Sequence, residues 1–193
     1  YRPKDTPLTV DGLRVEIRLA NHGGQFKRIN SSAVVVGRSN LTLNRLEITV
    51  REREAMMSSL LSVGGCVNVE VNNATVSGAT YHGLGYNMLN SNAANIRYND
   101  CISTNSRKGL DGRHGKNISV RGGFYNTIED HYGRNMTIRD VVMSGLSTDI
   151  PGYTTPAVNL DAWGFVPRRP FGFSGANLHI ENCVVDRAPA GLF

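Results

Sequence analysis

The chain lacks the features that would place it in several large classes of protein. Its three cysteines, Cys66, Cys101 and Cys183, show no Cys-x-x-Cys spacing and cannot all pair, so neither a zinc cluster nor a disulfide framework is indicated. Two of them fall on an apolar position of the repeat described below, which predicts buried free thiols. No apolar run approaches the roughly 20 residues of a membrane helix, so we expect no membrane insertion.

The positively charged residues are not gathered in any one stretch of the chain. Lysine and arginine are spread from Arg2 to Arg187 without a basic run, and the net charge is only +5, so we expect no nucleic-acid partner. The first ten residues, YRPKDTPLTV, are not a signal peptide. Because the chain begins without Met, we expect it to be a segment of a longer one.

What the sequence has in quantity is turn-forming residues. Glycine occurs 21 times and asparagine 19 times, whereas apolar residues make up 40% and aromatic residues 7%. This composition favours many short strands over long helices. With no shift in composition along 193 residues, the sequence predicts a single all-β domain over 1–193.

A repeat headed by asparagine is the strongest pattern. Apolar residues follow the asparagine at positions +1, +3, +6 and +8, and the positions +4 and +5 are mostly Asn, Asp, Gly or Arg. The copies are NLTLNRLEI at Asn40, NVEVNNATV at Asn68, NIRYNDCIS at Asn95, NISVRGGFY at Asn117, NMTIRDVVM at Asn135 and NLHIENCVV at Asn177. A degenerate seventh copy is predicted at Asn159 (NLDAWGF).

The step from +3 to +6 shifts the inside–outside alternation by one residue, which predicts a corner at +4 and +5. Coils of about 18 to 28 residues, each unable to bury its own apolar face, are typical of a solenoid. The sequence therefore predicts a parallel β-helix of about seven coils, in which the stacked asparagines form a side-chain ladder.

Three regions do not follow the repeat. Residues 1–31 contain Leu8 to Leu19, which alternates around Asp11-Gly12 and predicts a β-hairpin or a sheet edge. Within the coils of residues 32–186 we expect two excursions. One lies near residues 49–62, where Thr49 to Leu61 suggests a short helix or a long loop, and the other spans residues 145–174.

The two best-aligned coils carry the candidate site. With Asn117 placed over Asn135, Asp111 lies over Glu129, and equivalent positions on adjacent coils are about 4.8 Å apart. Close carboxylates raise the pKa of one partner and so provide an acid and a base. The catalytic candidates are Asp111, Glu129, Asp130 and His131.

The same polar stretches supply candidates for substrate binding: Arg113, His114, Tyr132, Arg134 and, in the second excursion, Trp163. Arginines suit an acidic sugar, and His131 or Tyr132 is a candidate base for a lyase-type proton abstraction. Two alternatives are open: these charged residues are solvated structural turns, and Trp163 packs against the solenoid. The sequence indicates no metal ligands and no cofactor.

The repeated segments resemble the right-handed parallel β-helix superfamily of pectate lyases, polygalacturonases and bacteriophage tailspikes. The resemblance covers about Ser32 to Asp186, and DGRHGKNISVRGGFY is most similar to phage tail spike or tail fibre proteins. It implies a homotrimer on the virion tail, outside the cell, in contact with other tail proteins, that binds and in many cases cleaves bacterial surface polysaccharide.

The resemblance does not extend to a catalytic signature. Neither an Asp-Asp followed by Gly-His-Gly nor a calcium-binding carboxylate cluster with a matched arginine occurs. A polysaccharide depolymerase, whether glycoside hydrolase or lyase, is therefore one hypothesis. The others are a non-catalytic virion or adhesin module and a cellular polysaccharide lyase or epimerase.

Overall fold

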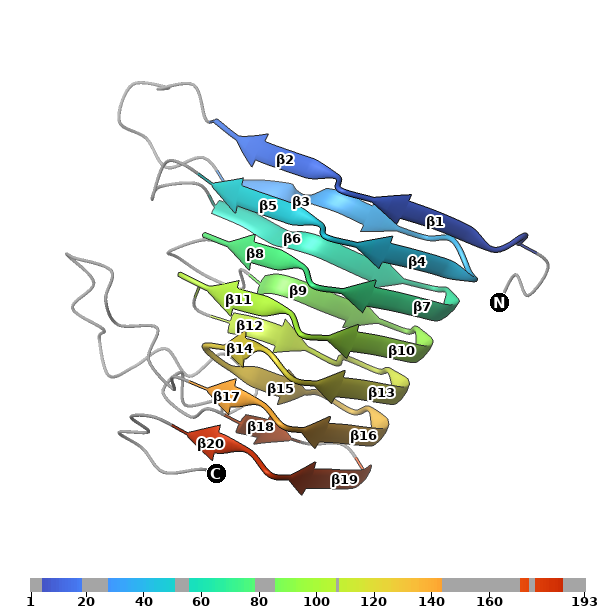
Figure 1. Ribbon diagram of the computed structural model, residues 1–193, viewed down its shortest axis with the longest axis vertical. Coiled ribbons are helices and arrows are strands. Elements are labelled where there is room, and N and C mark those ends of the chain that lie inside the picture. The colour runs from blue at the N-terminus through green and yellow to red at the C-terminus, as the bar shows by residue number, and fades with distance from the viewer. Residues whose placement is uncertain are drawn as a thin grey trace.

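The protein is built entirely from parallel strands in the part of the chain that the structure describes. The computed structural model describes residues 5–18, 28–50, 56–78, 86–106, 108–143, 171–173 and 176–185. Its regular elements are all β-strands, arranged in three sheets in which every pair is parallel. The fold is a parallel β-helix, which confirms the predicted fold class (Figure 1).

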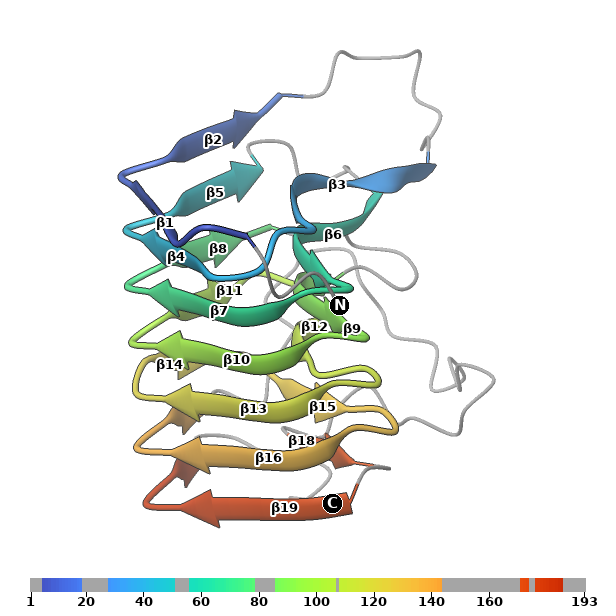
Figure 2. The same cartoon turned by 90° about the vertical axis from the view of Figure 1, so that its right-hand side faces the viewer.

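Each coil visits the three sheets in the same order. Sheet A contains β1 (Leu8–Asp11), β4 (Leu41–Asn44), β7 (Val67–Asn72), β10 (Ala94–Asn99), β13 (Lys116–Arg121), β16 (Arg134–Arg139) and β19 (Ala176–Glu181). Sheet B contains β2 (Arg14–Ile17), β5 (Glu47–Val50), β8 (Thr75–Ser77), β11 (Ile102–Thr104), β14 (Phe124–Tyr125), β17 (Val142–Met143) and β20 (Val184–Val185). Sheet C contains β3 (Arg28–Val36), β6 (Met56–Gly64), β9 (Tyr86–Ser91), β12 (Lys108–Asp111), β15 (Ile128–Asp130) and β18 (Phe171–Phe173). Seen from the N-terminal end, the chain runs clockwise as it recedes, which is a right-handed winding (Figures 1 and 2).

The asparagine at the head of each repeat lies where a strand of sheet A begins. All six have a left-handed backbone, with φ between 55° and 61°: Asn40, Asn68, Asn95, Asn117, Asn135 and Asn177. Asparagine adopts this conformation more readily than other residues with a side chain. From Asn68 on, each side-chain amide donates to the amide oxygen of the preceding head asparagine at 2.9 or 3.0 Å. The predicted asparagine ladder is confirmed.

A second left-handed corner explains the shift in the repeat. The residue at +5 joins sheet A to sheet B, and in every coil its φ is positive, as at Arg45 (52°), Asp100 (51°) and Gly122 (66°). This single residue reverses the alternation, so that +6 and +8 point inward again. The predicted corner lies where the sequence placed it.

The core consists of the inward side chains stacked coil upon coil. In sheet A, Val69, Ile96, Ile118 and Met136 are register partners with at most 2% of their surface exposed. Burial of such a side chain contributes about 1.5 to 3 kcal/mol. Because each coil covers the apolar face of the next, stability depends on stacking rather than on any single coil.

The cysteines follow the prediction of free thiols. Cys66 and Cys101 are buried and unpaired, and Cys183 is partly buried and unpaired. Burial raises the pKa of the Cys66 thiol and raises that of Cys101 to about 11.

Of the two alternatives for Leu8 to Leu19, the hairpin is wrong and the sheet edge is confirmed in the described residues. Strand β1 pairs with β4 and β2 pairs with β5, so the two strands lie at the edges of different sheets and Gly12 forms a coil corner. The segment is an additional copy of the repeat, with apolar residues at +1, +3, +6 and +8 after Pro7. A search anchored on asparagine passes over it because proline stands at the head.

The helix considered for Thr49 to Leu61 is also wrong in its described residues. Strand β5 ends at Val50 and β6 begins at Met56, with residues 51–55 outside the described part. Leu60 and Leu61 are both fully buried, so a strand covered on both faces produced the consecutive apolar residues that suggested a helix.

The copy of the repeat predicted at Asn159 lies outside the described residues. Strand β16 pairs directly with β19, and Asn177 donates to Asn135 at 2.9 Å, which leaves no place for a strand between them. Residues 144–170, which include most of the predicted second excursion, lie outside the described residues.

No helix in the described residues is long and apolar enough to cross a membrane.

Candidate functional site

Two acidic side chains lie on the outward face of sheet C. Leu110 in β12 and Ile128 in β15 are register partners that face the core and are fully buried. The next residues, Asp111 and Glu129, are partners as well, and because side chains alternate along a strand they point to the other face. The stacking expected from the alignment of the two coils is therefore present.

These outward charged groups are nevertheless removed from solvent. The exposed fraction is 0% for Asp111, 4% for Glu129 and 5% for His131, which directly follows β15. Removing an ion from water costs several kcal/mol unless partners compensate. Solvated turns, the simpler alternative, do not describe these three residues.

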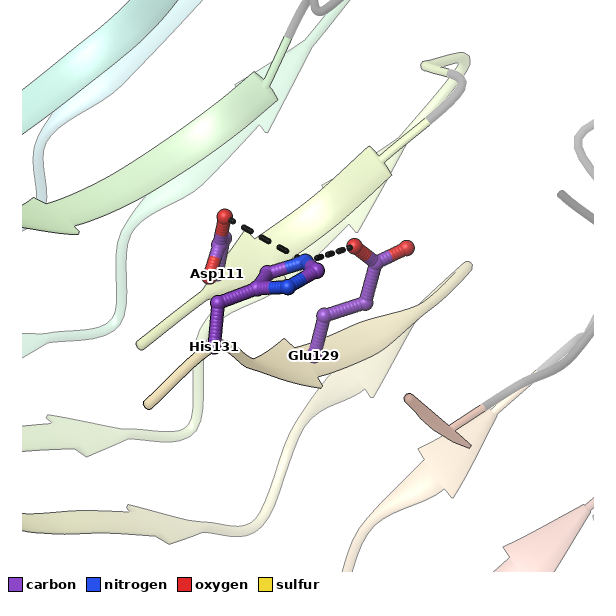
Figure 3. A group of neighbouring side chains, drawn as sticks. All are labelled: Asp111, Glu129 and His131. Carbon is purple, nitrogen blue, oxygen red and sulfur yellow. Dashed lines mark hydrogen bonds and ion pairs between the residues drawn. The ribbon is translucent and has the colours of Figure 1, made fainter. Parts of the chain in front are cut away.

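His131 lies between the two carboxylates. Its Nε2 atom is 3.2 Å from Glu129 Oε2 and 3.9 Å from Asp111 Oδ2 (Figure 3). Only the shorter of these distances is a hydrogen bond. The imidazole is therefore hydrogen-bonded to Glu129, with Asp111 close to the same nitrogen.

Arg113 forms an ion pair with the carboxylate of Asp111. Its Nη2 donates to Asp111 Oδ2 at 3.2 Å and to the hydroxyl of Tyr86 at 2.5 Å, and the guanidinium lies 5.4 Å from the centre of the Tyr86 ring. The Arg113 side chain is one-third exposed, whereas Asp111 is fully buried. The cluster thus extends from a buried acid–base centre to a cation that reaches solvent.

A stacked aromatic pair lies at the exposed corner beside this cluster. The rings of His114 and Tyr132 are 5.4 Å apart and 15° from parallel, and Tyr132 is 51% exposed. Both residues have positive φ, 50° and 60°. The equivalent corner residues of the two preceding coils, with similar φ, are Gly65 and Asn92, which suit this backbone better. Two aromatic rings here cost stability that the fold does not require.

Comparisons with known proteins give little beyond the fold. No protein-family profile and no curated protein matches the chain. Among solved structures, the chain is similar to a provisionally assigned glycosyl hydrolase from Parabacteroides merdae ATCC 43184, with 10% identity and a TM-score of 0.46. The match covers 92% of this chain and 71% of that one. So distant a similarity assigns no function, and the site has to be judged on its geometry.

Asp130 belongs to a different environment from the other catalytic candidates. It follows Glu129, so its side chain turns toward the interior, where it is 3% exposed and lies against Gly112 and Gly133. A Cβ atom at Gly133 would be 2.1 Å from Asp130 Oδ1. Burial raises the pKa of Asp130 to about 6, although neighbouring His131 and the backbone amide of Gly133 lower it. Asp130 fills a coil corner rather than the outward site.

Of the two remaining candidates, only Arg134 lies in the described residues, and it lies away from sheet C. Arg134 is exposed at the start of β16, in sheet A. Trp163 lies outside the described residues.

Tyr86 is a residue that the sequence analysis missed. It stands nine residues before Asn95, and Lys108 stands nine before Asn117, so an alignment extended further toward the N-terminus pairs them. The structure has this register, with Tyr86 opposite Lys108 in sheet C. The signal was present but lay outside the polar stretch used for the alignment.

Proposed function

We propose that the protein binds bacterial surface polysaccharide on the outward face of sheet C and cleaves it with the acid–base cluster of Asp111, Glu129 and His131. One observation carries the proposal. Three buried ionisable groups converge where the solenoid itself requires none, since the preceding coil has Leu89 at the same register position. Buried ionisable groups without a structural purpose are typical of functional sites.

The geometry favours proton transfer through His131 over attack by a carboxylate. Oxygen atoms of Asp111 and Glu129 and the imidazole nitrogen all lie within 4.8 Å of one another. A retaining glycosidase has carboxyls about 5 to 5.5 Å apart with the sugar between them. Here the imidazole occupies that space, so His131 is the proton-transferring group and the two carboxylates orient it.

The exposed groups fit a sugar chain. An aromatic ring such as Tyr132 stacks on the apolar face of a sugar, and Arg113 offers a cation to an acidic one. In a lyase reaction on such a uronic acid, His131 takes the proton beside the carboxylate and a carbon–carbon double bond forms. The bond to the leaving sugar oxygen breaks, and that oxygen takes up a proton from water. In hydrolysis, water adds across the broken bond and no double bond appears.

The biological setting within this proposal rests on the resemblance of the repeat alone. It is a module of a phage tail spike or fibre, homotrimeric, located on the virion tail and in contact with other tail proteins. In this setting the solenoid supplies a stiff support and sheet C the surface that meets the host polysaccharide.

The proposal is tested by incubating the protein with purified capsular polysaccharides and lipopolysaccharides and measuring reducing ends and absorbance near 235 nm. Reducing ends alone indicate hydrolysis, and both signals together indicate a lyase. The decisive variant is His131→Asn. Its matched control is His179→Asn, since His179 lies 3.3 Å from Glu181 with the same spacing in sequence but on an exposed surface.

We expect His131→Asn to abolish cleavage and His179→Asn to retain it. Binding without cleavage by the unchanged protein would remove the enzymatic part of the proposal and favour an adhesin. Absence of both binding and cleavage across the panel would leave a structural module as the function.

A further inference from the structure

We propose that Asp111, Glu129 and His131 bind a divalent first-row metal ion of the Zn²⁺ type. Each residue offers one ligand atom, and the three atoms lie within 4.8 Å of one another on the outward side of sheet C (Figure 3). The inference extends the site described above and rests on the same residues, but ion binding does not require that the site cleave a polysaccharide.

The distances between the ligand atoms are near those around a bound ion. In tetrahedral coordination with bonds of about 2.0 to 2.2 Å, neighbouring ligand atoms are roughly 3.3 to 3.6 Å apart. His131 Nε2 is 3.2 Å from Glu129 Oε2 and 3.9 Å from Asp111 Oδ2. The oxygens of Asp111 and Glu129 lie within 4.8 Å of each other, so side-chain shifts of up to about 1 Å bring all three atoms to bonding distance from one ion.

An ion satisfies the three groups better than a proton does. A proton on His131 Nε2 lies on the line to one acceptor, and at 3.9 Å the Asp111 oxygen is beyond hydrogen-bonding distance from that nitrogen. An ion at the centre bonds all three atoms at once and offsets the repulsion between two buried carboxylates. A shared ion therefore stabilises the cluster more than a proton does.

The support around the cluster also resembles that of a metal site. Asp111 and Glu129 are fixed on adjacent strands, and Arg113 holds Asp111 Oδ2 while also bonding Tyr86. Groups that hold ligands in place from outside determine much of the affinity of protein metal sites.

The ligand set selects the type of ion. One imidazole nitrogen with two carboxylate oxygens suits Zn²⁺ and similar ions, and three protein ligands leave a fourth position open for water or substrate. Ca²⁺ and Mg²⁺ prefer six or more ligands that are all oxygen. Bound Zn²⁺ would occupy Nε2 of His131, the atom that the proposed cleavage uses, so we expect Zn²⁺ to inhibit His131-dependent cleavage.

The test is calorimetric titration of the metal-free full chain with ZnCl₂, and separately with CaCl₂, in the absence of polysaccharide. We expect one Zn²⁺ per chain and no comparable Ca²⁺ binding. Glu129→Gln is expected to weaken Zn²⁺ binding by about 10-fold or more, since it removes a direct ligand where even outer groups account for 10- to 100-fold. The matched control, Glu181→Gln, disrupts the exposed His179–Glu181 pair and is expected to bind as the unchanged protein does.

A second measurement protects the test against loss of folding. Co²⁺ in place of Zn²⁺ gives a visible absorption band in a four-coordinate site, and we expect this band in the unchanged protein and in Glu181→Gln but not in His131→Gln. Equal Zn²⁺ affinity in Glu129→Gln and Glu181→Gln overturns the inference, and so does the absence of Zn²⁺ binding to the unchanged protein. Cleavage without ion binding rejects this inference alone, whereas ion binding without cleavage rejects only the proposed function.

Discussion

The asparagine ladder offers the sharpest test of the fold, because one residue combines a backbone requirement with two side-chain bonds. Asn117 has φ 56°, donates to Asn95 at 2.9 Å and accepts from Asn135 at 2.9 Å. Replacement by alanine removes both bonds and places an ordinary side chain in the left-handed region. Replacement by glycine removes the same bonds but tolerates the backbone.

The expected loss of stability follows from these two terms. The side chain is exposed, so each hydrogen bond contributes about 0.5 kcal/mol, the low end of its range. The left-handed conformation costs alanine about 1 to 2 kcal/mol more. We therefore expect Asn117→Ala to lose about 2 to 3 kcal/mol. Glycine loses about 1 kcal/mol with the bonds and about 0.4 to 1 kcal/mol through its freer unfolded chain.

The measurement is urea unfolding of the full chain. The midpoint urea concentrations of the variants are compared at a constant dependence of the unfolding free energy on urea. Ser119, which lies in β13 between two buried residues of the same strand, is the control position. There the backbone is extended, so Ser119→Ala should be more stable than Ser119→Gly by about 0.5 to 1 kcal/mol. At position 117 the order should reverse. If Asn117→Ala proves as stable as Asn117→Gly, left-handed corners do not determine the position of the coils.

Three further outcomes are expected. Gly123→Ala should destabilise the protein far more than Gly12→Ala, as measured by thermal unfolding. A Cβ atom at Gly123 would be 2.0 Å from the backbone oxygen of Cys101, whereas nothing lies within 4 Å of a Cβ atom at Gly12. Equal losses of stability in the two variants would contradict the close contact at Gly123. Iodoacetamide at pH 8 should modify Cys183 in the folded protein and spare Cys101, whose pKa burial raises to about 11, until denaturant is added, as mass spectrometry of peptides will show. Asp130→Asn should leave polysaccharide binding and cleavage intact, because Asp130 points inward. The same variant should stabilise the protein above pH 6. A carboxyl whose pKa is raised to about 6 favours folding at low pH and loses that contribution as the pH rises from about 4 through 6. Loss of cleavage in this variant would place Asp130 in the site after all.

The fold could be predicted from the sequence because its corners are chemically specific. A left-handed backbone favours asparagine, aspartate or glycine, and these residues recur at the head and at +5 of the repeats from Asn40 to Asn177, with Arg45 the exception at +5. The first coil escaped detection for the same reason. Pro7 stands at its head, and the proline ring excludes the left-handed conformation that the asparagines share.

The candidate site could be predicted only in part. Period-two alternation with the register of the repeat placed Asp111 over Glu129, and the same alternation could have shown that Asp130 faces the interior. Burial could not be predicted this way. Whether an outward side chain of sheet C meets water depends on what lies over the sheet, and a pattern of apolar and polar residues within a strand carries no information about that.

The strongest argument for function comes from comparing one coil with the next. A solenoid repeats the same structural position in each coil, so the residue in the preceding coil shows what the fold accepts there. At the corner before sheet A the fold accepts Gly65 and then Asn92, yet the two coils that carry the acid–base cluster have His114 and Tyr132, at a cost in backbone strain. In sheet C the same two coils replace a partly buried leucine with buried carboxylates. Two independent positions therefore depart from what stability favours, in the same coils and on adjoining surfaces, and such departures are expected where selection has favoured a site over stability.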